Sequence, residues 1–165
     1  MIVILMGVSG VGKSTVGALL ARKTGWPLYD ADDFHSPANV EKMRSGIPLT
    51  DEDRWPWLDR LNAVLREVDQ RHGSALLACS ALKQRYRDRL ALGLENVRWV
   101  HLTGSFELIK QRIDAREGHY MTAKLLESQF AALEAPSDAI IIDVSAEPEP
   151  LAAQVYAALG LGKLA

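Results

Sequence analysis

The sequence contains very little cysteine and no long apolar run. Cys79 is the only cysteine among 165 residues, so no disulfide can form within the chain, and a reducing compartment suits it. No apolar stretch approaches the roughly 20 residues that a membrane-spanning helix needs. The chain starts directly with strand-like residues and lacks the basic segment of a signal peptide. These absences predict a cytoplasmic protein without a membrane contact, with Cys79 in its core.

An excess of either charge is also missing. The chain has 19 Lys and Arg against 21 Asp and Glu, for a formal net charge of -2. Neither a basic excess nor a run of like charge favours nucleic acid as a partner. We find no internal repeat and no low-complexity segment. The length and a 48% hydrophobic composition predict one globular domain over residues 1–165.

The most informative stretch is a glycine-rich loop at residues 7–14, which reads GVSGVGKS and matches the P-loop pattern G-x-x-x-x-G-K-[ST]. The apolar residues 2–6 before it predict a buried strand, and residues 15–23 after it predict a helix. Glycines let several backbone N–H groups point at one anion, and the helix start adds its positive dipole end. Lys13 can reach the outer phosphates, and the Ser14 hydroxyl can ligate Mg²⁺. The loop therefore predicts a nucleotide and Mg²⁺ as cofactors.

Four further strands are predicted at residues 26–29, 75–80, 97–102 and 139–142. Helical patterns separate them, among them a short helix over 36–43 and a long one that begins with a capping box at 50–53. Strands that alternate with helices form βαβ units, and right-handed crossovers place helices on both faces of a parallel sheet. The predicted fold is a three-layer α/β/α P-loop NTPase fold.

Three carboxylates follow the predicted strand 26–29, where open α/β sheets bind their ligands. They belong to Asp30, Asp32 and Asp33. We expect at least one of them to be functional. An Asx turn or a helix N-cap is the alternative, which suits Asp33 best.

Cations follow the strand 75–80 in two pairs spaced four residues apart. Lys83 and Arg87 share one helix face, and Arg85 and Arg89 share another. One pair is expected on a solvated face. Lys83 and Arg87 are nearest the strand end, so we expect them to meet an anionic substrate.

Three further arginines are candidates for ligand binding. Arg54 lies in the acidic first turn of the long helix, where the dipole disfavours a cation, so it either binds a ligand or pairs with a nearby Asp. Arg112 and Arg116 precede Gly118 and are typical of a mobile lid over phosphates. The alternative for both is neutralisation of a helix C-terminus.

Several motifs together resemble gluconokinase of the small P-loop type. They are residues 7–14, DDFH at 32–35 with PAN at 37–39, DRWPWL at 53–58, CSALK at 79–83 with YR at 86–87, and GH at 118–119 with SQF at 128–130. The resemblance covers residues 2 to about 143. It implies phosphorylation of D-gluconate at the 6-hydroxyl with MgATP, and, by similarity to shikimate and adenylate kinases, a sheet order of 2-3-1-4-5.

The resemblance and the chemistry together give each candidate residue a role. The ATP site is predicted to comprise Gly7, Val8, Ser9, Gly10, Val11, Gly12, Lys13, Ser14, Thr15, Arg112 and Arg116. Gluconate would be bound by Asp32, His35, Arg54, Lys83 and Arg87, with the cations on its carboxylate. Lys13 and Asp32 are the predicted catalytic residues, and Ser14 and Asp30 the predicted metal site. Which of Asp30 and Asp32 is the base stays open.

Two rival functions are weighed against this reading. One is another kinase of the same fold, for shikimate or a nucleoside monophosphate. The other is a GTP-dependent switch protein, which the absence of an N-K-x-D motif disfavours. The oligomeric state stays open, with a homodimer as one alternative.

Overall fold

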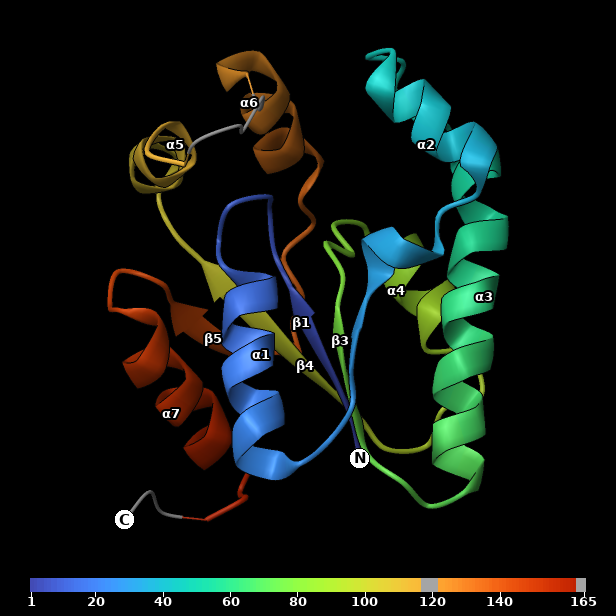
Figure 1. The fold of residues 1–165 in the computed structure, drawn as a ribbon, viewed down its shortest axis with the longest axis vertical. Helices are drawn as coiled ribbons and strands as arrows, with labels where there is room; N and C mark the ends of the chain where they lie inside the picture. The colour runs from blue at the N-terminus through green and yellow to red at the C-terminus, as the bar shows by residue number, and fades with distance from the viewer. Residues whose placement is uncertain (117–121, 163–165) are drawn as a thin grey trace.

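The computed structural model describes residues 1–116 and 122–162 and arranges them around a five-stranded sheet (Figure 1). All neighbouring strands are parallel, in the order β2-β3-β1-β4-β5. The predicted fold and the predicted sheet order are therefore confirmed. The strands are β1 (Ile2–Met6), β2 (Leu28–Asp30), β3 (Ala75–Ala78), β4 (Val97–Thr103) and β5 (Ile140–Asp143).

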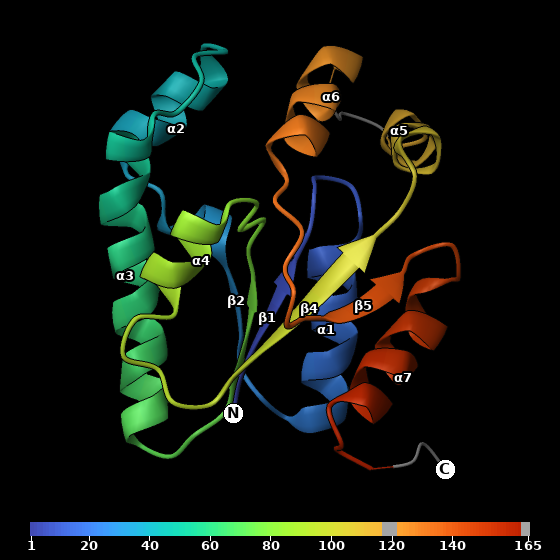
Figure 2. The same ribbon diagram turned by 180° about the vertical axis from the view of Figure 1, so that it is seen from behind.

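Helices cover both faces of this sheet, and others extend past its carboxyl end. α1 (Lys13–Thr24) and α7 (Pro148–Ala158) lie on one face, and α3 (Asp51–Gln70) and α4 (Gln84–Leu90) on the other (Figures 1 and 2). Both views show the remaining helices beyond the carboxyl ends of the strands. They are α2 (Pro37–Arg44), α5 (Phe106–Asp114) and α6 (Ala123–Ala132).

The strand β1 explains why two cores form. Its successive side chains point to opposite faces, as in any strand. Val3 and Leu5 pack with α1 and α7, while Ile2, Ile4 and Met6 pack with α3 and α4. All five are fully buried. A continuous apolar run is what a strand covered on both faces requires.

The helix ends follow their local sequence signals. Ser36 caps α2 with Pro37 in the first turn, and Thr50 and Asp53 form the predicted capping box of α3. Gly25 ends α1 in a left-handed conformation, which glycine adopts readily. In the part of the chain that the structure describes, no helix combines the length and the apolar character of a membrane span.

Element boundaries differ from the predictions by a few residues. β2 begins at Leu28 and not at Trp26, because Pro27 has no N–H to donate to a neighbouring strand. α4 begins at Gln84, which leaves Lys83 at the N-cap. Cys79 is buried, as predicted for a core residue, and His101 is buried as well. Burial raises the pKa of the Cys79 thiol to about 12, so it stays protonated.

Candidate active site

The P-loop connects the carboxyl end of β1 to the start of α1 and has the backbone that its glycines allow. A Cβ atom on Gly7 would lie 2.6 Å from the Leu102 carbonyl oxygen, so only glycine fits there. Gly12 has φ +96° and caps α1, and a Cβ atom there would meet nothing within 4 Å. No side chain caps the first N–H groups of α1. Such a cradle suits a phosphate group.

Lys13 folds back over this loop. Its Nζ donates hydrogen bonds to the carbonyl oxygens of Gly7 at 2.9 Å and Val8 at 3.0 Å. Burial lowers the pKa of Lys13 to about 8, while the carboxylates of Asp32 and Asp30 oppose this change. An anion beside the amine would offset the cost of burying its charge. The geometry thus keeps a cation ready beside the cradle.

One pocket of about 250 Å³ brings the predicted residues of three segments together. It lies at the carboxyl ends of β1, β2 and β3, the edge at which the sequence predicts ligand binding. Its lining combines amide donors, two cations and two carboxylates, which suits a phosphate and a metal ion. The lining residues are Ser9, Gly10, Gly12, Lys13, Ser14, Thr15, Asp30, Asp32, Ala78, Cys79, Ser80 and Arg116.

Asp30 and Asp32 occupy different positions in this pocket. Asp30 accepts a hydrogen bond from the Ser14 hydroxyl at 2.9 Å and another from the Asp32 backbone N–H at 3.0 Å. It thereby caps the 3₁₀ helix η1 (Ala31–Phe34), a role that the sequence suggested for Asp33. The pKa of Asp32 is raised, first by loss of solvent and second by the negative charge of Asp30. Asp30 is thus bonded to Ser14, the other predicted metal ligand, and Asp32 lines the same pocket without taking part in that bond.

His35 follows η1 and stacks against Trp57 of α3. The ring centroids are 4.2 Å apart with an interplanar angle of 16°. The Trp57 Nε1–H donates to the Ala31 carbonyl oxygen at 2.7 Å, which fixes η1 against α3. Burial lowers the pKa of His35, so a neutral imidazole is favoured. Its Nδ1 is buried and has no hydrogen-bond partner among the described residues.

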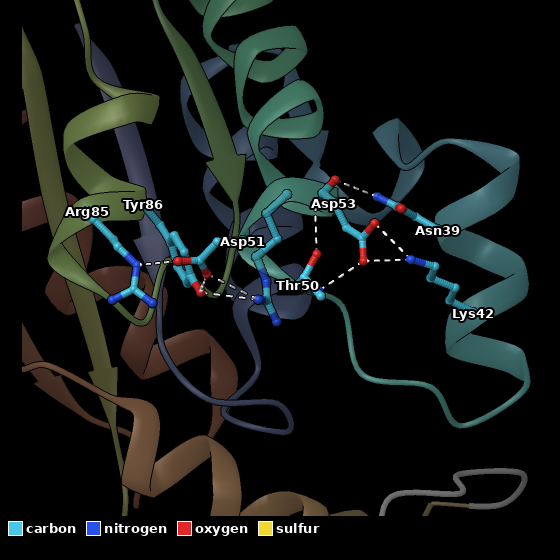
Figure 3. Close-up of polar contacts among 8 residues, drawn as sticks. Asn39, Lys42, Thr50, Asp51, Asp53, Arg85 and Tyr86 are labelled. Atoms are coloured by element: carbon cyan, nitrogen blue, oxygen red, sulfur yellow. Dashed lines mark hydrogen bonds and ion pairs between the residues drawn. The ribbon is translucent and has the colours of Figure 1, made fainter.

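The first turn of α3 connects α2 and α4 (Figure 3). The Asp53 carboxylate accepts from Lys42 Nζ at 2.9 Å and from the Thr50 backbone N–H at 2.9 Å, and the Asp53 carbonyl accepts from the Asn39 side chain. The Thr50 N–H and then the Lys42 amine lower the pKa of Asp53 to about 2. Asp53 is therefore ionised at neutral pH, and its ion pair with Lys42 holds α2 against the start of α3.

Arg54 lies beside this junction and is half-buried. Its Nη1 donates to the Tyr86 hydroxyl at 3.1 Å and lies 3.7 Å from an Asp51 carboxylate oxygen. The pairing that the sequence offered as an alternative is therefore present. The Arg54 side chain keeps 29% of its surface exposed, so it is not sealed off from solvent as Arg87 is.

The structure covers Arg87, one of the residues predicted to bind substrate, and favours a structural role for it. Arg87 is only 3% exposed, and it donates to the Ala81 carbonyl at 2.7 Å and the Glu134 carbonyl at 2.7 Å. These contacts join the loop after β3 to the segment after α6. Lys83 does not share this environment: it is half-buried at the N-cap of α4. A four-residue spacing specifies a shared helix face and not which face is covered, so the sequence could not separate Lys83 from Arg87.

Replacing Arg87 by alanine should lower the free energy of unfolding by about 2–3 kcal/mol, because two buried carbonyl groups lose a charged donor. Urea denaturation measures this. Arg71→Ala is a matched control, since Arg71 pairs with Glu67 on an exposed helix face and should change stability by less than about 0.5 kcal/mol. Unchanged stability in Arg87→Ala, with a large rise in substrate KM, would restore the substrate role to Arg87.

Arg112 and Arg116 lie on the other side of the P-loop. Arg116 lines the pocket, and Arg112 Nη2 is 3.5 Å from the Ser145 carbonyl in the loop between β5 and α7. The predicted lid includes Gly118, which lies outside the described residues. The assignment of Arg112 and Arg116 to the ATP site remains a prediction, which the position of Arg116 in the pocket favours.

Sequence reasoning assigned no role to Gln129, Tyr86 or Asp51. The Gln129 side-chain oxygen accepts a hydrogen bond from the Ser9 backbone N–H at 2.7 Å, which ties α6 to the P-loop. Both Gln129 and Tyr86 lie within motifs that carry the family resemblance, and that was the available signal. Their contacts span 120 and 35 residues of sequence, so no local pattern could reveal them.

Comparisons with known proteins agree with this geometry. The shikimate kinase family model matches residues 9–159. Two solved structures share the fold: a sugar kinase from Janibacter sp. HTCC2649 at 45% identity and TM-score 0.89, and a gluconokinase from Sinorhizobium meliloti at 37% identity and TM-score 0.87. They cover 98% and 96% of this chain, and the alignments span 95% and 91% of those chains. At 19% identity, an adenylyl-sulfate (APS) kinase from Mycobacterium tuberculosis, with TM-score 0.68, shows the fold alone.

Curated relatives narrow the family. A probable gluconokinase from Rattus norvegicus is 47% identical over 96% of this chain and 97% of its own length. A gluconokinase from Gluconobacter oxydans is 47% identical over 89% of this chain and 83% of its own. The thermosensitive gluconokinase of Escherichia coli is 43% identical over 86% and 78%. With identities this high over nearly the whole length, and with a complete P-loop facing two carboxylates, the chain belongs to the gluconokinase family of P-loop kinases.

Proposed function

We propose that this chain, as a single kinase domain, transfers the γ-phosphoryl group of ATP to the 6-hydroxyl of D-gluconate, giving 6-phospho-D-gluconate and ADP. The observation that carries the proposal is the pocket that joins Lys13 and Ser14 of the P-loop to Asp32 at the end of β2. A kinase needs its phosphate cradle and its hydroxyl-binding group in one cavity. The names of the relatives supply the substrate.

The residues present fit ATP and Mg²⁺. Gly12 leaves open space at the start of α1, and the Ser14 hydroxyl lies 2.9 Å from an Asp30 carboxylate oxygen. Mg²⁺ prefers oxygen ligands and is usually held by one or two protein groups together with substrate phosphates. Ser14 and Asp30 would hold the ion, which supplies charge neutralisation on the phosphates when it is bound.

Each catalytic residue then has a physical task. Lys13 would move its amine from the Gly7 and Val8 carbonyls to the phosphates and stabilise charge that develops during transfer. Asp32 would accept a hydrogen bond from the 6-hydroxyl, aim it at phosphorus and take its proton. Arg54 and Lys83 would bind the carboxylate at the far end of gluconate, and the neutral His35 would bind a hydroxyl.

The decisive experiment is a substrate panel with ATP consumption as its readout. D-gluconate should be consumed far faster than shikimate or nucleoside monophosphates, and the product should carry phosphate at carbon 6. Preference for shikimate or a monophosphate would favour the second reading, another small-molecule kinase of this fold. The shikimate kinase family model matches this chain, but the curated relatives reported above are all named gluconokinases.

Replacing Lys83 by alanine should raise the KM for gluconate by roughly 10-fold or more, because a charge-assisted hydrogen bond is lost. The KM for ATP should stay near the parent value. Lys23→Ala, an exposed lysine at the far end of α1, serves as the control. A rise in the KM for ATP instead would move Lys83 to the nucleotide half of the site.

The proposal includes a cytoplasmic location. A single buried thiol at Cys79 and an ATP-dependent reaction both suit a reducing compartment that contains ATP. Cell fractionation with an antibody to the chain tests it.

A further inference from the structure

The Tyr86 hydroxyl bridges Asp51 and Arg54. It donates a hydrogen bond to an Asp51 carboxylate oxygen at 2.6 Å and accepts one from Arg54 Nη1 at 3.1 Å (Figure 3). A carboxylate only accepts and a guanidinium only donates, so the direction of both bonds is determined. Tyr86 itself is only 8% exposed and cannot easily turn away. The bridge therefore restrains where the Arg54 guanidinium lies.

The Tyr86 ring adds a second restraint. The Arg54 Cζ lies 5.2 Å from the ring centroid, and the Arg85 Cζ lies at the same distance. Guanidinium groups at this distance are attracted by an aromatic ring. Trp55 packs edge-on against the same ring at 6.0 Å and so supports it. Arg54 is thus held both by a hydrogen bond from Nη1 to the Tyr86 hydroxyl and by the cation–π contact with the Tyr86 ring.

The two arginines at this corner differ in how closely they are paired. Asp51 lies 2.7 Å from Arg85 Nε and 3.7 Å from Arg54 Nη1. The Glu134 carboxylate also acts on Arg85. Arg54 therefore has the weaker ion pair of the two, which leaves its guanidinium the better partner for a further anion.

We propose that Tyr86 and Asp51 are positioning residues that hold the Arg54 guanidinium ready for the carboxylate of the substrate. The inference rests on the proposed function. A free arginine would lose several rotatable bonds on binding, and a pre-oriented one loses fewer. Tyr86 would thereby raise the preference of the enzyme for a sugar acid over the corresponding uncharged polyol.

The test is a double-mutant cycle that combines Tyr86→Phe with Arg54→Ala. The Tyr86→Phe substitution keeps the aromatic ring and removes only the bridging hydroxyl. Tyr86→Phe should raise the KM for gluconate about 3–10-fold, as expected for one lost hydrogen bond, with kcat and the KM for ATP within about two-fold. In the Arg54→Ala background the same change should have no further effect. Arg71→Ala is the control: Arg71 is exposed, pairs with Glu67 at the far end of α3, and should leave both KM values unchanged.

A second readout separates positioning from folding. The ratio of kcat/KM for gluconate to that for glucitol, which lacks the carboxylate, should fall by the same factor in Tyr86→Phe. Asp51→Asn should shift the ratio in the same direction, which covers the case that Tyr86→Phe does not fold. Equal losses for both substrates, or an undiminished Tyr86→Phe effect in Arg54→Ala, would overturn the inference.

The proposed function fails in a different way. If the parent enzyme phosphorylates another acid and not gluconate, gluconate turnover is absent before any substitution is made. The cycle is then run on the acid that the parent accepts. Coupling between positions 86 and 54 on that acid would support the positioning role, and its absence would refute it.

Discussion

Lys13→Met should abolish nearly all turnover and leave the fold intact. The side chains have similar length, so the substitution mainly removes the charge. Lys13 is placed beside the phosphate cradle by hydrogen bonds to the Gly7 and Val8 carbonyls. Removing one well-placed group that stabilises charge in the transition state costs on the order of 10²–10³ in kcat, and a cation on the transferred phosphoryl group costs more.

Stability gives this prediction its control. Burial lowers the pKa of Lys13 to about 8, which means that the folded protein disfavours the charged amine. Below that pH the charge opposes folding, and methionine removes the opposition. Methionine also removes the hydrogen bonds to the Gly7 and Val8 carbonyls, which offsets this gain. Circular dichroism should therefore match that of the parent, and the thermal midpoint should stay within a few degrees, roughly 1 kcal/mol in stability. Near-normal steady-state turnover in a folded Lys13→Met variant would remove the P-loop from the mechanism.

Asp32→Asn should reduce kcat by roughly 10²–10⁴-fold, the range that general bases contribute. The amide keeps the shape of the carboxylate and loses its ability to take a proton. Because the transition state of phosphoryl transfer is loose, the proton moves late, and the lower end of the range is the more natural result. The KM for ATP should change little, since the substituted group meets the hydroxyl and not the nucleotide.

Two neighbouring carboxylates supply the comparison. Asp30→Asn should raise the Mg²⁺ concentration needed for half-maximal activity, because Asp30 accepts a hydrogen bond from the Ser14 hydroxyl, the other proposed metal ligand. Asp33→Asn should resemble the parent, because Asp33 is exposed and does not line the pocket. If Asp30→Asn shows the large loss in kcat while Asp32→Asn stays near normal, the two roles are assigned in reverse.

The pH profile tests the same assignment. The pKa of Asp32 is raised above its ordinary value, so its carboxylate takes up a proton at a higher pH than a free Asp does. Since a protonated Asp32 cannot accept the hydroxyl proton, kcat/KM should fall as the pH falls through this raised pKa. The acidic limb should be absent from the small residual activity of Asp32→Asn.

The sheet and the nucleotide half of the site were predictable because their causes are local. A strand buried on both faces needs a continuous apolar run, and residues 2–6 supply one. A phosphate cradle needs glycines at fixed spacing, and the lysine and serine that follow are adjacent in sequence. Strand ends in a parallel sheet meet at one edge, so Asp30 and Asp32 were expected in the pocket that contains them.

The substrate half depended on contacts that sequence spacing does not encode. Lys83 and Arg87 share a helix face in the sequence, yet Arg87 is buried by the Ala81 and Glu134 carbonyls, the latter 47 residues away. Tyr86 is uncharged, so no charge pattern marked it as a candidate. The positioning role proposed for it depends on a hydrogen bond to Asp51, which is 35 residues away in the sequence.

Local chemistry in the sequence thus determined the strands, the phosphate cradle and the two acidic residues beside it. Which cations are buried, and which stay partly exposed beside the site, was decided only when α3, α4 and the segment after α6 packed together. The physical reason is that burial selects among chemically equivalent arginines. The chain contains several with the same charge, and only tertiary packing covers Arg87 while it leaves Arg54 partly open.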